Sequence, residues 1–312
     1  MKTHPSAQAF DGERATVVTI GTFDGVHVGH RKIIQRLLAS AKSNDFESVV
    51  LTFFPHPRMV VQKNADIKLI NTIKERKKLL EKTGLDHLII HPFTLDFSRL
   101  SAEAYVKDIL VDQLHAKKVI IGYDHHFGRN RNADIDDLKR FGKEYGFEVE
   151  EISKQDIDDV SISSTKIRNA LNLGDLEKAN TYLGHPFMLT GTVSRGKGLG
   201  RKMNYPTANL QIAESYKIIP HKGVYVVQST IDGKKEFGMM SIGTNPTVGG
   251  SDLTIETFFF DLDRDLYDRE LEIQVLKRIR DEKNFNNIEE LIEAMGFDEQ
   301  FSRDYIATMH AE

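Results

Sequence analysis

The chain has 312 residues, enough for two domains of ordinary size, although a single large domain is also possible. Its formal net charge of -4 gives no overall attraction to nucleic acid or to an acidic membrane surface, so a polyanion would need a local binding site. The absence of cysteine excludes disulfides, thiolate metal sites and a cysteine nucleophile. The N-terminus lacks the apolar core of a signal peptide and no run approaches the ~20 apolar residues of a membrane span, so we expect a cytoplasmic protein without nucleic-acid or membrane partners.

The first 150 residues alternate short apolar runs with amphipathic stretches. The apolar runs are continuous, which is typical of strands in a parallel sheet that is covered on both faces. The predicted strands are 16–21, 48–54, 87–93, 117–123 and 147–152, and the predicted helices between them are 31–41, 72–83 and 101–114. This alternation predicts an α/β domain with a Rossmann-like, doubly wound sheet, whose ligands bind at the carboxyl ends of the strands.

The pattern of predicted elements changes after two further predicted helices, 163–173 and 175–183. Closely spaced strands without intervening helices indicate an antiparallel sheet or a small barrel. The predicted strands are 188–193, 208–212, 224–231, 234–242, 254–260 and 271–279, and two terminal helices are expected at 288–295 and 298–309. Asp232-Gly233 is a strong type I′ hairpin signal. We therefore place the domain boundary near Gly184 and expect domains of residues 1–183 and 184–312.

A glycine-rich corner, G-T-F-D-G-V-H-V-G-H, joins the first predicted strand to the first predicted helix. Glycines such as Gly21 and Gly29 let backbone amides approach an anion, and a helix start presents unpaired N–H groups. His27 and His30 would donate hydrogen bonds to phosphate oxygens as negative charge builds during displacement at phosphorus. The alternative is a glycine turn with incidental histidines. The paired histidines and the strand-turn-helix context together favour phosphate chemistry.

Two further segments of the first half carry polar residues suited to anion binding. Ser164 and Thr165 fall in a first helical turn and Arg168 follows one turn later on the same face, so all three side chains would face one anion. A helix cap with a solvated arginine is the alternative. Pro55-His56-Pro57 directly follows a predicted strand, and its alternative is a stiff turn.

The second half holds a glycine loop that leads into an extended segment, G-T-V-S-R-G-K-G-L-G-R-K-M-N-Y-P-T-A-N-L. A flexible loop bearing Lys197 and Arg201 can close over a triphosphate. Thr207 and Asn209 are two residues apart, so they face the same way on a strand and offer hard oxygen ligands suited to Mg²⁺. Glu256 is a single carboxylate in an apolar strand, where it could act as a general base. The alternative for Thr207 and Asn209 is a polar pair on an exposed strand edge, and the alternative for Glu256 is a charged residue of an edge strand.

These motifs together resemble the prokaryotic bifunctional riboflavin kinase/FMN adenylyltransferases (FAD synthetases). The H-x-G-H core alone is less specific, because it also occurs in pantetheine-phosphate adenylyltransferases, cytidylyltransferases and class I aminoacyl-tRNA synthetases. The matching segments are 21–30, T-F-F-P-H-P-R-M-V at 52–60, G-Y-D-H-H-F-G-R-N-R at 122–131, I-S-S-T-K-I-R at 162–168, 191–210, the segment after Thr254, and R-D-E-K-N-F at 280–285. They span nearly the whole chain in the family's order.

The resemblance implies a C-terminal six-stranded riboflavin kinase barrel and an N-terminal FMN adenylyltransferase domain, with ATP as co-substrate, Mg²⁺ or a similar cation, and no tightly bound organic cofactor. Riboflavin, FMN and FAD are the implied flavins. Catalytic roles fall on Glu256, His27 and His30, and metal binding falls on Thr207 and Asn209. Implied ATP or phosphate contacts are Gly21, Phe23, Asp24, Gly29, Ser164, Thr165, Arg168, Gly196, Lys197, Gly198, Gly200 and Arg201, and implied flavin contacts are Pro55, His56, Asp124, Phe127, Arg280 and Phe285.

Three positions depart from the family pattern. His125 replaces an aromatic residue, which puts a stacking contact there in doubt. Asn204 and Asp268 stand where the family usually has glycine, and both residue types tolerate a left-handed turn. Two other functions are kept open: an enzyme with only one of the two activities, and a flavin- and nucleotide-binding regulator without turnover.

Overall fold

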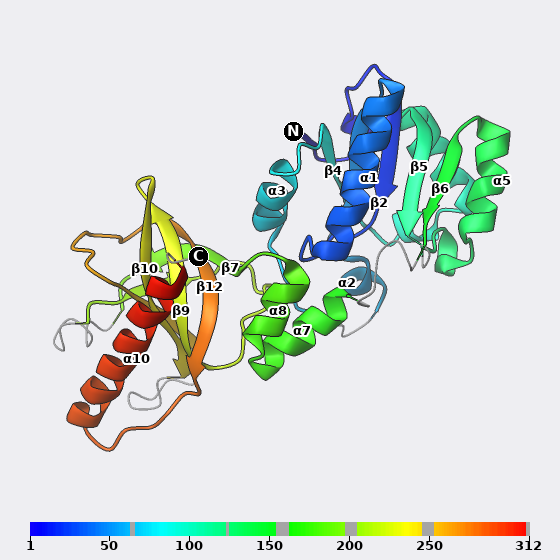
Figure 1. Cartoon of the computed structure of the whole chain (residues 1–312). Helices are drawn as coiled ribbons and strands as arrows, with labels where there is room; N and C mark the ends of the chain where they lie inside the picture. Colours follow the sequence, from blue (N-terminus) through cyan, green and yellow to red (C-terminus); the bar gives the residue numbers. More distant parts are fainter. Residues whose placement is uncertain (63–65, 123–124, 154–161, 197–204, 245–252, 310–312) are drawn as a thin grey trace. The chain divides into compact units, whose positions relative to one another are not determined.

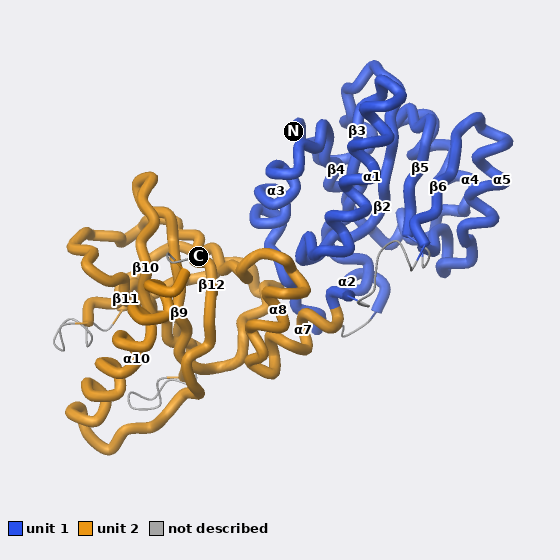
Figure 2. The backbone as a smooth tube through the Cα atoms, in the orientation of Figure 1, with its two compact units in different colours: residues 1–164 blue, residues 165–312 orange. Residues whose placement is uncertain are grey.

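The computed structural model describes residues 1–62, 66–122, 125–153, 162–196, 205–244 and 253–309. The chain forms two compact units, residues 1–164 and 165–312 (Figures 1 and 2). The predicted domain boundary at 183/184 lies later in the chain than the division between these two units. The division comes earlier because helix α8 (Leu176–Leu183) packs on the barrel of the second unit. There the Asn180 side-chain amide donates to the Val275 carbonyl at 3.0 Å.

The first unit is built on a six-stranded parallel sheet of order β1-β4-β3-β2-β5-β6. Its strands are β1 (Lys2–His4), β2 (Thr16–Ile20), β3 (Glu47–Phe54), β4 (His87–Pro92), β5 (Ala116–Gly122) and β6 (Glu148–Ile152). The five predicted strands are confirmed, whereas the short edge strand β1 carries no apolar pattern and was not predicted. Because the chain continues from β2 toward β3 and later returns to β5 on its other side, the strand order reverses at β2, where a ligand crevice is expected.

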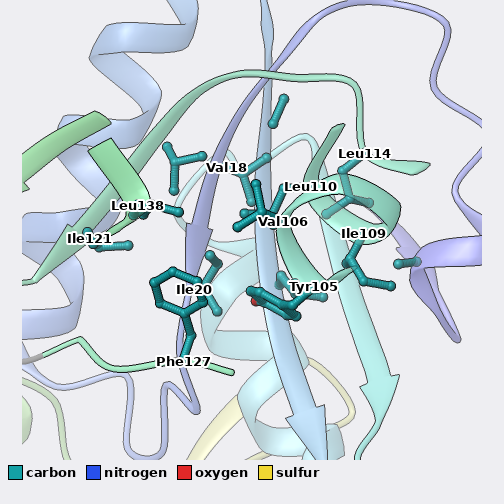
Figure 3. Packing of buried hydrophobic residues seen from close by; sticks show 14 of the residues in the cluster. Val18, Ile20, Tyr105, Val106, Ile109, Leu110, Leu114, Ile121, Phe127 and Leu138 are labelled. Atoms are coloured by element: carbon teal, nitrogen blue, oxygen red, sulfur yellow. The ribbon is translucent and has the colours of Figure 1, made fainter. Parts of the chain in front are cut away.

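Alternate strand residues form two separate cores. On one face Val17, Val50 and Ile120 pack against α1 (Val28–Asn44) and α3 (Ile73–Glu81). On the other face Val18 and Ile121 pack against the helical segment η3 (Tyr105–Gln113) and α5 (Ile135–Tyr145), as Figure 3 shows. The predicted helix at 101–114 is present as α4 (Ala102–Ala104) followed by η3, which has π-helical hydrogen bonding. The remaining helical segments are η1 (Ala7–Ala9), α2 (Pro57–Val61), η2 (Phe97–Arg99) and η4 (Arg129–Arg131).

The second unit is a closed six-stranded antiparallel barrel of order β10-β11-β8-β7-β12-β9. Its strands are β7 (Phe187–Ser194), β8 (Ala208–Gln211), β9 (Gly223–Ile231), β10 (Lys234–Thr244), β11 (Leu253–Phe259) and β12 (Glu270–Arg280). All six correspond to predicted strands. Asp232 and Gly233 join β9 to β10 with φ of 50° and 80°, which confirms a hairpin with two left-handed central residues.

Helices of the second unit are α7 (Ser164–Leu173), whose first residue belongs to the first unit, α8 and α10 (Ile288–Met309). Two terminal helices were predicted on either side of Gly296-Phe297, but the structure has one continuous helix there. Glycine in a helix interior costs only about 1 kcal/mol relative to alanine. The Arg280 guanidinium offsets this by holding the Asp298 carboxylate at 2.7–3.2 Å, which anchors α10 to the end of β12.

Candidate functional sites

The backbone turns sharply within a few residues in the glycine-rich corner after β2. Phe23, Gly25 and Val26 have φ of 47°, 93° and 39°. Positive φ is rare for a bulky or β-branched residue, and such strain collects at functional sites. The corner ends at His27, which caps α1 by accepting the backbone N–H of His30 on its Nδ1 at 3.3 Å. The corner therefore places both histidines at the start of α1.

The two histidine rings lie face to face, with centroids 3.6 Å apart and planes inclined by 19°. Because His27 Nδ1 accepts a hydrogen bond, the neutral ring carries its proton on Nε2. Burial, with the nearby His27 and Arg76, lowers the pKa of His30 well below its usual value of 6.5. His30 is therefore neutral at pH 7 and has a single N–H to donate.

Ser164 joins the same corner from the end of the first unit. Its hydroxyl donates to the Asp24 carbonyl at 2.9 Å, so the structure brings a predicted phosphate-binding residue to the predicted phosphate-binding loop. Thr165 and Arg168 lie on α7 in the second unit, where Thr165 is exposed and Arg168 is half-buried. Their phosphate contacts stay predictions.

Phe23 and Asp24 are both buried beneath the corner. The Phe23 ring packs in the core, with its centroid 5.0 Å from that of His30. The Asp24 carboxylate accepts the backbone N–H groups of Ile70 and Asn71 at 3.0 and 3.1 Å and forms an ion pair with Arg76 at 3.5 Å. These side chains therefore support the corner from within the fold, and the ATP contact implied for the two residues stays a prediction.

Sequence reasoning missed Arg76. The signal was present, because Arg76 lies one helical turn before the buried Leu80 and so occupies an apolar position of the α3 stripe.

The predicted flavin-side residues of the first unit lie at the ends of β3 and β5. Pro55 is exposed, whereas His56 is buried and caps α2 by accepting the Arg58 backbone N–H at 3.1 Å. Phe127 belongs to the core, and its ring is nearly parallel to that of His125 at 6.0 Å between centroids. Asp124 lies outside the described residues.

In the barrel, the predicted metal and base residues converge. The Thr207 hydroxyl donates to the Glu256 carboxylate at 3.1 Å, and Glu256 is the register partner of Asn209 between β11 and β8. All three are half-buried, whereas the intervening Ala208 and Ile255 point into the barrel. The pairing of β8 with β11 thus brings Thr207 and Asn209 into one polar cluster with Glu256, which lies 49 positions after Thr207 in the sequence.

Two hollows are each lined by one residue of this cluster. One of about 350 Å³ is lined by Asn209, Ser194 and Thr254 among others. The other, of about 510 Å³, is lined by Thr207, Thr257 and Tyr267 among others. A group-transfer reaction between two substrates requires two binding sites that meet at the reacting atoms, and these hollows are the candidates for them.

Among the other predicted residues of the second unit, one is confirmed, two stay predictions and five lie outside the described residues. The Arg280 guanidinium is engaged by Asp298 and lies 5.8 Å from the Phe285 ring centre, so a flavin contact for this pair stays a prediction. Asp268 has φ of 59°, which confirms the left-handed turn expected there. Lys197, Gly198, Gly200, Arg201 and Asn204 lie outside the described residues.

Both halves of the chain match known protein families. Residues 10–166 match the model of the FAD synthetase family, and residues 183–306 match that of the riboflavin kinase family. The fold and its two sites therefore define a class of two-domain enzyme in which an adenylyltransferase precedes a flavin kinase. The two matches leave out residues 167–182, which contain most of α7 and α8.

Relatives match over nearly the whole length. The bifunctional riboflavin kinase/FMN adenylyltransferase of Listeria monocytogenes is 37% identical over 94% of this chain and 93% of its own, and that of Escherichia coli K12 is 34% identical over the same shares. A crystal structure described as a macrolide-efflux protein from Streptococcus pneumoniae has a TM-score of 0.87 at 29% identity and covers 97% of this chain and 98% of its own. The chain belongs to the bifunctional riboflavin kinase/FMN adenylyltransferase family and carries both enzyme domains. None of the described helices is long and apolar enough to cross a membrane.

Proposed function

We propose that the barrel unit phosphorylates riboflavin to FMN and that the parallel-sheet unit adenylylates FMN to FAD, with ATP as co-substrate of both reactions. The observation that carries this proposal is the convergence of Thr207, Asn209 and Glu256 in a chain that also matches the FAD synthetase family in its other half. The flavins and ATP are the expected small-molecule partners. We further propose a cytoplasmic enzyme that needs no tightly bound organic cofactor and binds neither nucleic acid nor membrane.

In the kinase reaction, Glu256 takes the proton from the riboflavin 5′-hydroxyl. The electron pair left on the 5′-oxygen attacks the γ-phosphorus of ATP. The bond between that phosphorus and the bridging oxygen breaks, and ADP leaves. The Thr207 hydroxyl orients the carboxylate through its hydrogen bond. Gly196, Lys197, Gly198, Gly200 and Arg201 would cover the phosphates.

The residues fit a magnesium site. The Thr207 hydroxyl donates its hydrogen bond to Glu256, which leaves the lone pairs of its oxygen for a cation, and Asn209 offers an amide oxygen on the same strand. No group of three or more His, Asp or Glu side chains suited to a metal occurs within the described parts of the chain, so the counter-charge would come from ATP. Bound there, Mg²⁺ would neutralise the triphosphate.

In the adenylylation, an FMN phosphate oxygen attacks the α-phosphorus of ATP and pyrophosphate leaves. No protein nucleophile is needed, because positioning and charge stabilisation supply most of the catalysis. His27 and His30 donate hydrogen bonds to the phosphate oxygens on which charge develops. Backbone amides near Gly21 and Gly29, together with Ser164, Thr165 and Arg168, would bind the ATP phosphates.

The test supplies riboflavin, ATP and Mg²⁺ to the full chain and resolves the flavins by chromatography. We expect FMN first and FAD after it, with FAD also formed from FMN supplied directly. Loss of one step alone would support a single-activity enzyme. Tight flavin binding without any conversion would support the regulator and overturn the proposal.

Gly196→Ala tests the placement of Asn209. A methyl group at residue 196 would lie 2.7 Å from Asn209 Cγ, so the amide must move away. We expect FMN formation to fall by roughly tenfold and to need more Mg²⁺, because a misplaced ligand weakens the metal site. Steady-state kinetics against Mg²⁺ concentration measure this. Gly296→Ala, where nothing lies within 4 Å, is the matched control and should leave both activities unchanged.

A further inference from the structure

Arg76 of α3 is a buried cation outside every motif of the sequence. It is 2% exposed and is the bulkiest fully buried side chain among the described residues. Its guanidinium lies 3.5 Å from the fully buried Asp24 carboxylate and 3.4 Å from the Thr52 hydroxyl. A buried charge is strongly unfavourable unless it is paired, so this arrangement holds Arg76 and Asp24 together.

The partners of Arg76 have further partners in the candidate adenylyl-transfer site. The Thr52 hydroxyl donates to the Thr22 carbonyl at 3.1 Å, which ties the end of β3 to the glycine-rich corner. The Asp24 carboxylate holds the backbone of residues 70–71, and the Asp24 carbonyl accepts the Ser164 hydroxyl. One guanidinium is therefore the centre of a network that joins the corner, the end of β3, the turn before α3 and Ser164.

Arg76 also acts on His30. Among the described parts of the chain, the charged and titratable groups that lower the pKa of His30 are His27 beside it and Arg76 from α3. A positive charge nearby disfavours the imidazolium, which keeps His30 neutral in the same direction as burial does. The network thus bears on both the position and the protonation state of a proposed catalytic group.

We propose that Arg76 is a positioning residue for adenylyl transfer, holding the glycine-rich corner, Thr52 and Ser164 in their working arrangement before substrates bind. This inference rests on the proposed FMN adenylylation. Arg76 touches no substrate in this role and acts through Asp24 and Thr52. Preorganisation of this kind matters because a misplacement of about 1 Å can reduce a rate about 10²-fold.

Two substitutions separate the charge of Arg76 from its geometry. Arg76→Gln keeps a hydrogen-bond donor without the charge, and Arg76→Lys keeps the charge without the planar fork. We expect Arg76→Gln to lower kcat for FAD formation by about 10²-fold with the KM of FMN and ATP nearly unchanged, and Arg76→Lys to recover about tenfold of that loss. FMN formation by the barrel, measured in the same samples, should stay at the wild-type rate. Arg99→Gln, an exposed arginine of the same unit, is the matched control.

A second readout is the titration of His30, followed by NMR and assigned by its loss in His30→Gln. Its pKa should move to higher pH in Arg76→Gln and stay in place in Arg76→Lys, which a role in folding alone would not produce. Thr52→Val removes the hydroxyl that links Arg76 to the Thr22 carbonyl but keeps the guanidinium and its ion pair with Asp24, so it serves if Arg76→Gln unfolds the first unit. It should lower kcat about tenfold without moving the His30 titration.

Wild-type kcat in Arg76→Gln, or in Thr52→Val, would overturn the positioning role, and so would an unmoved His30 titration in Arg76→Gln. Failure of the proposed function is distinguishable, because wild-type chain would then form no FAD from FMN.

Discussion

Glu256→Gln is expected to lower the rate of FMN formation from riboflavin by about 10³-fold, while FMN supplied directly is still converted to FAD at the wild-type rate. Glutamine is nearly isosteric with glutamate and can still accept the hydrogen bond from Thr207, so the cluster keeps its shape. It cannot take the proton of the 5′-hydroxyl, and loss of a general base typically costs 10²–10⁴-fold. Rates from riboflavin and from FMN, measured separately in one preparation, give the result.

The matched control for this substitution is Glu236→Gln. Glu236 is another half-buried strand carboxylate of the barrel, on β10, and has no proposed role. It should leave FMN formation unchanged. If Glu256→Gln forms FMN at the wild-type rate, the base assignment is wrong.

His27→Asn combined with His30→Ala is expected to stop the pathway at FMN. Removing one preorganised donor to a developing negative charge typically costs about 10²–10³-fold, and two donors that act together do not add fully. Asparagine at position 27 keeps an acceptor that can cap α1, so the helix start is retained while the imidazole is lost. We expect FAD formation to fall by at least about 10²-fold with FMN formation unchanged, measured as the FMN to FAD ratio over time.

The control is His115→Asn. His115 is exposed and has φ of 53°, a conformation that asparagine tolerates, so this change should leave the flavin products unaltered. The two single variants, His27→Asn and His30→Ala, show how the effect divides between the rings. Unimpaired FAD formation in the double variant would refute a role for both.

Much of the fold could be predicted because its signals are local. Continuous apolar runs identified five of the six parallel strands, and dense strands without helices indicated the barrel. The two elements that were predicted wrongly or missed, α10 and β1, also have physical explanations. β1 is a three-residue edge strand whose pairing comes entirely from β4, and α10 continues through Gly296 because Asp298 is anchored by Arg280. Neither partner can be read from the neighbouring residues in the chain.

The sequence by itself determined the family and the residues on which both reactions are proposed to depend, because motifs such as H-V-G-H and P-T-A-N-L are short and contiguous. Only the tertiary structure decided how these residues meet. Pairing of β8 with β11 brings Thr207 to Glu256, and packing of α3 places Arg76 against Asp24 and near His30. The reason is that hydrogen-bond partners and buried charge depend on contacts between distant segments, which no local pattern specifies.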